Sequence, residues 1–202
     1  MISERAAGVV LSGGAGSRIA GEKALLPFCA GTLLDAVIAR AAPQVSQLAL
    51  NVPQANADAY RTRYPGYSLL FDSFSDGIGP LAGVIAGLEW AHTLGGVDRL
   101  ATFPCDTPFL PHDLVAQLMA NAGDTPVFAH DGDRLHGVCA VWSLGCLETL
   151  RAGVEAGQLR SLHSAMEALN GKTCRIAGDE HAFFNVNTRE DLVQAEELAC
   201  GG

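Results

Sequence analysis

The stretch "AAGVVLSGGAGSRIAGEK", residues 6–23, begins as an apolar run and passes directly into a loop with four glycines, an arginine and a lysine. The apolar run predicts a buried strand. Glycines let several backbone N–H groups converge on one anion, because no side chain obstructs them. Arg18 can make a planar, bidentate contact with a phosphate, and Lys23 can supply a point charge. The pattern indicates a strand followed by a phosphate-binding loop; the alternative is a turn with two solvent-exposed cations.

The spacing of this loop excludes two common phosphate-binding patterns. The dinucleotide fingerprint G-x-G-x-x-G would need a third glycine where Ile19 stands. The P-loop pattern places its lysine where Glu22 stands, and Lys23 is followed by Ala24 rather than by a magnesium-binding hydroxyl.

Beyond the loop, short apolar strands alternate with helical stretches. Strands are predicted at 46–52, 67–72, 98–103, 125–130, 133–142 and 172–178. Helices are predicted at 32–42, 81–94, 112–121, 144–156, 161–169 and 188–198, the last with Thr188 as N-cap and Asp191 as its capping partner. This order predicts one α/β domain over residues 1–198, with three α/β/α layers around a mostly parallel sheet. Residues 199–202 are expected to form a flexible tail.

Composition limits the classes of partner. The 202 residues are 49% hydrophobic and 17% charged, which predicts a full core, and the net charge is -9. Without a dense Lys/Arg cluster, this charge argues against nucleic acid or an anionic membrane as partner. No apolar run reaches the ~18 residues of a membrane span. Six cysteines without C-x-x-C spacing, and no visible signal peptide, lead us to expect reduced thiols in a cytoplasmic monomer.

The carboxyl ends of the first four predicted strands carry polar residues, which are Ser12, Asn51, Asp72 and Asp106. Ligands of open α/β sheets bind at this edge. Asp106 lies in "PCDTPFLP" (104–111), where flanking prolines fix the backbone. Its carboxylate suits Mg²⁺, which prefers one or two carboxylates plus substrate phosphates. The alternative is an Asp turn that caps the next helix.

Gly79, Gly83 and Gly87 recur every four residues and leave one face of the helix at 81–94 bare. A bare face allows a close approach, either of a strand or of a nucleotide base and ribose.

Together these stretches resemble the molybdenum cofactor guanylyltransferases (molybdopterin-guanine dinucleotide biosynthesis protein A), within the glycosyltransferase-A-like nucleotidyltransferases. The matching segments, in the family's order from residue 8 to 192, are "GVVLSGGAGSRIAGEKALL", "LALN", "LLFDSFSDGIGPLAGVIAGL", "FPCDTPFLP" and "FFNVNTREDL". The resemblance implies a nucleotidyltransferase (Rossmann-like) fold.

The resemblance also implies the roles of single residues. It makes Lys23 the phosphate-binding lysine and Asp106 the Mg²⁺ ligand, and together with Arg18, which the loop pattern itself indicates as a phosphate contact, these are the expected catalytic residues. It places GTP and the molybdopterin cofactor at Leu11, Ser12, Gly13, Lys23, Asn51, Asp72, Asp106, Asn185 and Asn187, with the two late asparagines on the pterin-phosphate side. The glycine patterns themselves add Gly14 and Gly79 to the expected binding residues.

By this resemblance, the expected reaction is the Mg²⁺-dependent transfer of GMP from GTP to the terminal phosphate of the molybdopterin cofactor, with release of pyrophosphate. A molybdoenzyme apoprotein or its chaperone is the expected recipient.

Several alternatives stay open. The five steps from Arg18 to Lys23 match the cytidylyl branch, whereas guanylyl enzymes often have six, so transfer of CMP is one alternative. Another Mg²⁺-dependent nucleotidyltransferase and a non-catalytic nucleotide or cofactor carrier are the others. The family's H-P segment appears as His136-Gly137, and His136 either contacts substrate or is a strand histidine satisfied within the fold.

Overall fold

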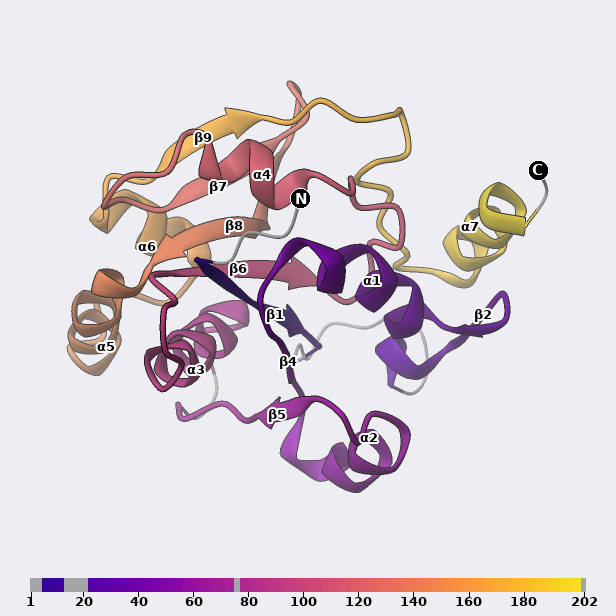
Figure 1. Cartoon of the computed structure of the whole chain (residues 1–202), viewed down its shortest axis with the longest axis horizontal. Helices are drawn as coiled ribbons and strands as arrows, with labels where there is room; N and C mark the ends of the chain where they lie inside the picture. The colour runs from indigo at the N-terminus through magenta and orange to yellow at the C-terminus, as the bar shows by residue number, and fades with distance from the viewer. Residues whose placement is uncertain (1–4, 13–21, 75–76, 201–202) are drawn as a thin grey trace.

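The chain forms a seven-stranded sheet covered by helices, seen in a computed structural model that describes residues 5–12, 22–74 and 77–200. Three predicted site residues, Gly13, Gly14 and Arg18, lie outside the described residues. The strand order is β5-β4-β1-β6-β8-β7-β9 (Figure 1). The strands are β1 (Ala6–Leu11), β4 (Leu48–Asn51), β5 (Ser68–Leu70), β6 (Arg99–Pro104), β7 (Val127–His130), β8 (Leu135–Ser143) and β9 (Lys172–Arg175). Only β8 runs against the other six, so the prediction of a mostly parallel sheet is confirmed.

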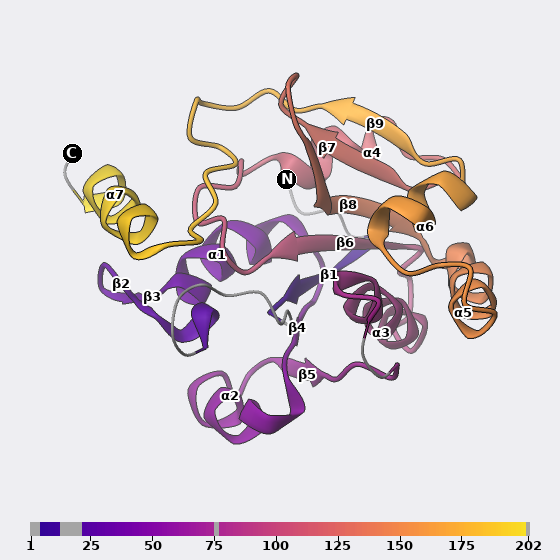
Figure 2. The same ribbon diagram turned by 180° about the vertical axis from the view of Figure 1, so that it is seen from behind.

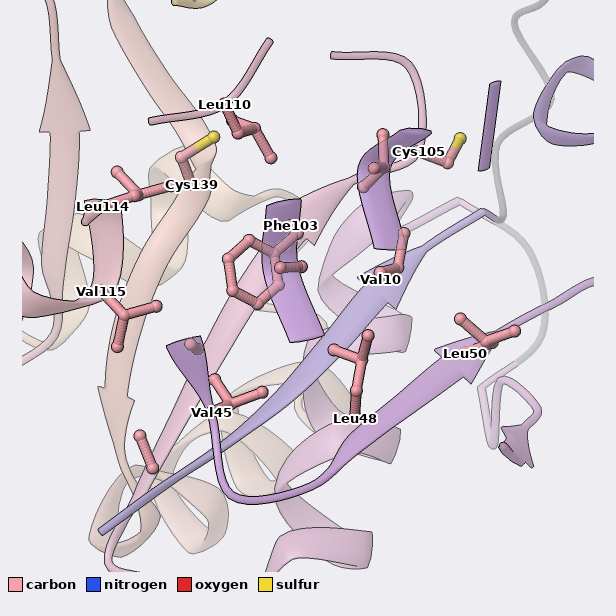
Figure 3. Packing of buried hydrophobic residues seen from close by; sticks show 14 of the residues in the cluster. Val10, Val45, Leu48, Leu50, Phe103, Cys105, Leu110, Leu114, Val115 and Cys139 are labelled. Carbon is pink, nitrogen blue, oxygen red and sulfur yellow. The ribbon is translucent and has the colours of Figure 1, made fainter. Parts of the chain in front are cut away.

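Helices cover both faces of the sheet, as predicted. Figure 1 shows α1 (Leu33–Ala41) and α4 (Leu114–Met119) in front of it, with α2 (Ala57–Arg63) near the β5 edge. Figure 2, from behind, shows α3 (Pro80–His92) and α6 (Leu162–Ala168), with α5 (Leu147–Glu155) beside them. The alternation of β1 explains the two layers, because Val10 points into one buried cluster and Val9 into the other. Figure 3 shows the first cluster, with Val10, Leu50 and Phe103 from strands beside Leu114 and Val115.

A third, smaller cluster joins α7 (Arg189–Cys200) to a two-stranded hairpin, β2 (Pro27–Phe28) with β3 (Gly31–Thr32). The predicted cap of α7 is confirmed: the Asp191 amide donates to Thr188 Oγ1 at 3.1 Å, and the Thr188 amide donates to Asp191 Oδ2 at 2.8 Å. The helix runs two residues further than predicted, so residues 199 and 200 belong to α7 rather than to a tail.

Strand β8 contains a bulge that the sequence pattern does not reveal. Its pairing with β7 jumps from Phe128 opposite Ala140 to Ala129 opposite His136, which leaves residues 137–139 outside the regular ladder. On the other side, the pairing of β8 with β6 ends at Thr102 opposite Ala140. The two strands therefore separate before the carboxyl end of β6. Bulges of this kind redirect side chains beside functional sites.

The cysteines and the membrane prediction can now be compared with the structure. Cys105, Cys139, Cys146 and Cys174 carry free thiols. Burial, and secondarily the Asp106 carboxylate, raise the pKa of Cys105 to about 12, so this thiol is protonated at neutral pH. Cys29 takes part in a disulfide bond, so the expectation of reduced thiols is wrong for this residue. In the described part of the chain, no helix is long and apolar enough to cross a membrane.

The glycine stripe of α3 serves close packing of the helix on the sheet. A Cβ atom at Gly83 would lie 2.5 Å from Asn51 Oδ1, and one at Gly87 would lie 2.9 Å from side-chain atoms of Val9 and Leu100. Gly79, at the start of α3, differs because it has a φ of +55° and a Cβ there would meet no atom of the described residues within 4 Å. Of the two alternatives for the stripe, the approach of strands accounts for Gly83 and Gly87.

We predict that Gly83→Ala destabilises the protein by about 1–3 kcal/mol, the usual cost of overpacking a core. The clash with Asn51 outweighs the helix-propensity gain of ~1 kcal/mol for alanine over glycine. Gly95→Ala is the matched control, because a Cβ there meets nothing within 4 Å and the φ is ordinary. Urea unfolding of both variants measures the difference; equal stabilities would contradict the close packing.

Candidate active site

A cavity of about 450 Å³ opens at the carboxyl ends of β1 and β6, facing the bulge of β8. Six predicted site residues line it: Leu11, Ser12, Lys23, Asp106, Asn185 and Asn187. Asn51, Asp72 and Gly79 are not among the lining residues; they lie next to it, at the ends of β4 and β5 and the start of α3. Most of the predicted site residues that the structure describes are thus gathered at one edge of the sheet.

Lys23 connects three distant parts of the chain inside this cavity. Its Nζ donates to Asp106 Oδ2 at 2.6 Å and to Asn187 Oδ1 at 2.7 Å. Both charged side chains are largely enclosed, with 13% of Lys23 and 18% of Asp106 exposed. The ammonium therefore balances a carboxylate that would be costly to desolvate alone.

The backbone around Asp106 holds this arrangement in place. The Asp106 carbonyl accepts a hydrogen bond from the Val186 amide at 2.9 Å. Val186 is fully buried in the third cluster, between the exposed Asn185 and Asn187. Buried alternation thus presents both asparagines on the solvent-facing side of this segment, beside the end of β6.

The donor set at Asp106 fits a divalent ion that is shared with a substrate. In the described ranges, no group of three or more His, Cys, Asp or Glu side chains forms a metal cage. Asp106 contributes one carboxylate, and Thr107 Oγ1 lies 3.3 Å from its Oδ1. One carboxylate completed by phosphate oxygens is the coordination that Mg²⁺ takes with phosphorylated substrates.

Asn51 and Asp72 form a second polar group beside the cavity. Asn51 Nδ2 donates to Asp72 Oδ1 at 2.9 Å, and the Asn51 carbonyl accepts from the Ser12 amide at 2.9 Å. Asn51 is 2% exposed, whereas Asp72 is exposed. The ends of β1, β4 and β5 are thereby linked, and the Asp72 carboxylate faces solvent from a fixed position.

The wall of the cavity beside the bulge of β8 includes residues that were not assigned from the sequence. The His136 ring stacks on Phe183, with centroids 4.0 Å apart and planes 10° apart. His136 Nε2 lies 2.8 Å from Asp131 Oδ2. Hydrogen bonds from the Arg134 amide, from His136 and from the Asp133 amide hold the pKa of Asp131 well below its usual range.

His136 is therefore paired within the fold and also lines the cavity, together with Arg134 and Phe183. The pair His136-Gly137 was noticed only through the family resemblance. Phe183 begins the family-like segment "FFNVNTREDL", but neither it nor Arg134 was assigned to the site, because the bulge and the ring stacking are tertiary features.

Comparisons with known proteins agree with this geometry. The sequence model of the "MobA-like NTP transferase domain" matches residues 8–172. A "Molybdenum cofactor guanylyltransferase" of Cereibacter sphaeroides is 40% identical over 192 residues, covering 95% of each chain. A protein of the same name from Mesorhizobium japonicum is 37% identical over 201 residues, again covering 95% of each chain.

Solved structures share the fold. The molybdopterin-guanine dinucleotide biosynthesis protein A of Archaeoglobus fulgidus superimposes with a TM-score of 0.79 at 23% identity, covering 97% of this chain and 100% of that one. The 2-C-methyl-D-erythritol 4-phosphate cytidylyltransferase of Thermus thermophilus gives 0.66 at 19% identity, covering 95% and 97%. The matched domain and the relatives establish a nucleotidyltransferase. This chain belongs to the family of the MobA-like NTP transferase domain.

Proposed function

We propose that this protein is a molybdenum cofactor guanylyltransferase, which transfers GMP from GTP to the terminal phosphate of the molybdopterin cofactor and releases pyrophosphate. The observation that carries this proposal is the enclosed Lys23–Asp106 ion pair, at the edge of the sheet where the glycine loop begins. The names of relatives that match along 95% of the chain support the choice of substrates.

The chemistry asks little of the protein beyond placement and charge. An oxygen of the acceptor phosphate forms a bond to the α-phosphorus of GTP, and the bond from that phosphorus to the bridging oxygen breaks. The electron pair leaves with pyrophosphate. Since the nucleophile is already an anion, no side chain has to remove a proton. The protein must align two anions that repel each other and neutralise charge as the bonds exchange.

Lys23 and Asp106 divide this work between them. Lys23 projects its ammonium into the cavity, where it can bind phosphate oxygens. Asp106 would hold the divalent ion, for which we propose Mg²⁺; when bound, the ion supplies positive charge that stabilises the transferring phosphate. Arg18, Gly13 and Gly14 lie outside the described residues, and their roles on the leaving pyrophosphate stay predictions.

We assign the two substrates to two sides of the cavity. Ser12, Asn51, Asp72 and Gly79 belong to the nucleotide side. The acceptor lies toward Asn185 and Asn187, next to the His136–Phe183 wall. This division leaves Lys23 and Asp106 between the two sides, where the phosphates meet. We further propose a cytoplasmic monomer that passes its product to a molybdoenzyme apoprotein or its chaperone.

A specific observation in the sequence supports one alternative. The five steps from Arg18 to Lys23 favour transfer of CMP from CTP to the same acceptor. Mass spectrometry of products from the protein, Mg²⁺, molybdopterin cofactor and an equimolar mixture of ATP, CTP, GTP and UTP decides between them. We expect the guanine dinucleotide to dominate. A cytosine dinucleotide would establish the alternative, and nucleotide binding without pyrophosphate release would indicate a carrier.

Asp106→Asn should lower kcat/KM by at least ~100-fold, the scale of losing a major electrostatic stabiliser. The amide keeps the size of the side chain and removes the charge that would hold the metal. Asp58→Asn is the control, since that side chain is 98% exposed. Pyrophosphate release measures turnover, and circular dichroism checks folding. Turnover of Asp106→Asn close to that of the control would exclude the metal role.

Lys23→Ala should raise the KM for GTP and also lower kcat, because the ammonium contacts phosphates in both the ground and the transition state. Lys172→Ala removes the other lysine of the chain, which is exposed at the start of β9, and should change neither constant more than about twofold. Steady-state kinetics on both variants provides the measurement. Unchanged constants for Lys23→Ala would make Lys23 a residue of the fold only.

A further inference from the structure

Glu22 stands directly before Lys23 and has no part in the reaction described above. Its carboxylate lines the same cavity. It accepts one hydrogen bond from the Tyr60 hydroxyl at 2.8 Å and another from the Asn56 side-chain amide. Both donors come from the segment that follows β4, which is η3 (Gln54–Asn56) and the start of α2. Two oxygens of one carboxylate are thus held by two donors from another part of the chain.

Tyr60 makes this hold rigid. The residue is fully buried in the first cluster, so its ring cannot move without disturbing the core. Burial, and then the hydrogen bond and charge of Glu22, raise the pKa of Tyr60 well above its usual range. The phenol is therefore a protonated donor at neutral pH. A buried hydroxyl also needs its acceptor, so the bond to Glu22 is favoured from both ends.

Glu22 is fixed through its backbone as well. Its carbonyl accepts a hydrogen bond from the Leu25 amide at 3.0 Å, which begins the single turn η1 (Lys23–Leu25). Because the side chain and the carbonyl of Glu22 are both held by hydrogen bonds, the backbone position of Lys23 and the direction of its Cα–Cβ bond are fixed. Lys23 then needs to order only its own flexible stem to place its ammonium beside Asp106.

We propose that Glu22 is a positioning residue: Tyr60 and Asn56 hold its carboxylate, and the fixed Glu22 aims Lys23 at the phosphates. The inference rests on the proposed function for the reaction that Lys23 serves. The donors also engage a negative charge that would otherwise face the incoming phosphates from the cavity wall. A Glu before the lysine is therefore compatible with an anion site.

The chain offers a matched pair of tyrosines for the test. Tyr64 lies one turn after Tyr60 with its ring centroid 6.1 Å away, is also buried in the first cluster, and bonds through its hydroxyl to Thr32 Oγ1 at 2.8 Å. Tyr60→Phe and Tyr64→Phe each remove one buried hydroxyl and keep the ring. Both should lower the melting temperature by similar amounts. Tyr60→Phe alone should lower kcat/KM for GTP, by about tenfold, because small displacements of a catalytic group are costly.

A double-mutant cycle separates positioning from general loosening of the fold. If Tyr60 acts through Lys23, adding Tyr60→Phe to Lys23→Ala should cost less than about twofold further, since the effects of coupled residues do not multiply. Asn56→Ala, which removes the other donor, should behave in the same way. Equal losses in Tyr60→Phe and Tyr64→Phe, or a full tenfold loss in the Lys23→Ala background, would overturn the inference.

Calorimetric binding of nucleotide and Mg²⁺ to the full chain separates this inference from the proposed function. The nucleotide used is the one that wild-type protein binds most tightly among GTP, CTP, ATP and UTP. If the wild type forms no dinucleotide with molybdopterin, the proposed function fails. Tyr60→Phe should then still weaken nucleotide binding in protein that keeps Lys23, but should not weaken it further in the Lys23→Ala variant. If the dinucleotide forms while Tyr60→Phe matches Tyr64→Phe in binding and in kcat/KM, the positioning role alone fails.

Discussion

The ion pair between Lys23 and Asp106 is the interaction around which this site is built. The two residues lie 83 positions apart, yet they meet because β1 and β6 are neighbours in the sheet, with Leu11 opposite Pro104. Parallel neighbours end at the same edge, so the segments that follow them face each other. The enclosed carboxylate requires a cation, and Lys23 supplies it. Asn187 joins the pair and brings the late segment of the chain to the same point.

Much of this arrangement could be predicted from the sequence, because it follows from strand order. Ser12, Asn51, Asp72 and Asp106 each lie at the carboxyl end of an apolar strand, and those four strands occupy consecutive places in the sheet. Parallel order then places the four side chains in a row. The Asn51–Asp72 hydrogen bond shows this directly, since it joins the ends of adjacent strands. The capping pair of α7, Thr188 and Asp191, could also be predicted from the sequence, because capping depends on residues only three positions apart.

Features that depend on tertiary fit could not be predicted. The sequence of β8 predicts one regular strand, and nothing in its pattern indicates the bulge at 137–139. The bulge lies where β8 pairs with β6 on one side and with β7 on the other. Arg134 and Phe183 line the cavity near that bulge, and Phe183 stacks on His136. The β2–β3 hairpin has two residues in each strand, too few for a periodic signal. In the sequence the glycine stripe is compatible with two interpretations. The structure favours the approach of strands at Gly83, because a Cβ there would collide with the side chains of Asn51 and Leu11.

Charge balance explains why the described side chains cannot be the whole site. Among the described residues that line the cavity, the formally charged ones are the carboxylates of Glu22 and Asp106 and the cations of Lys23 and Arg134, so their formal charges cancel. A nucleoside triphosphate and a phosphate monoester would bring several negative charges into this neutral space, on a protein whose net charge is already -9. Binding both would require positive charge from elsewhere, and the proposed sources are a divalent ion at Asp106 and the amides and Arg18 of the glycine loop. Asp106 would hold that ion, and the Lys23 ammonium, which pairs with Asp106 in the structure, would then bind the phosphates. The same two side chains thus balance each other's charge and are the groups proposed to bind the metal and the substrates.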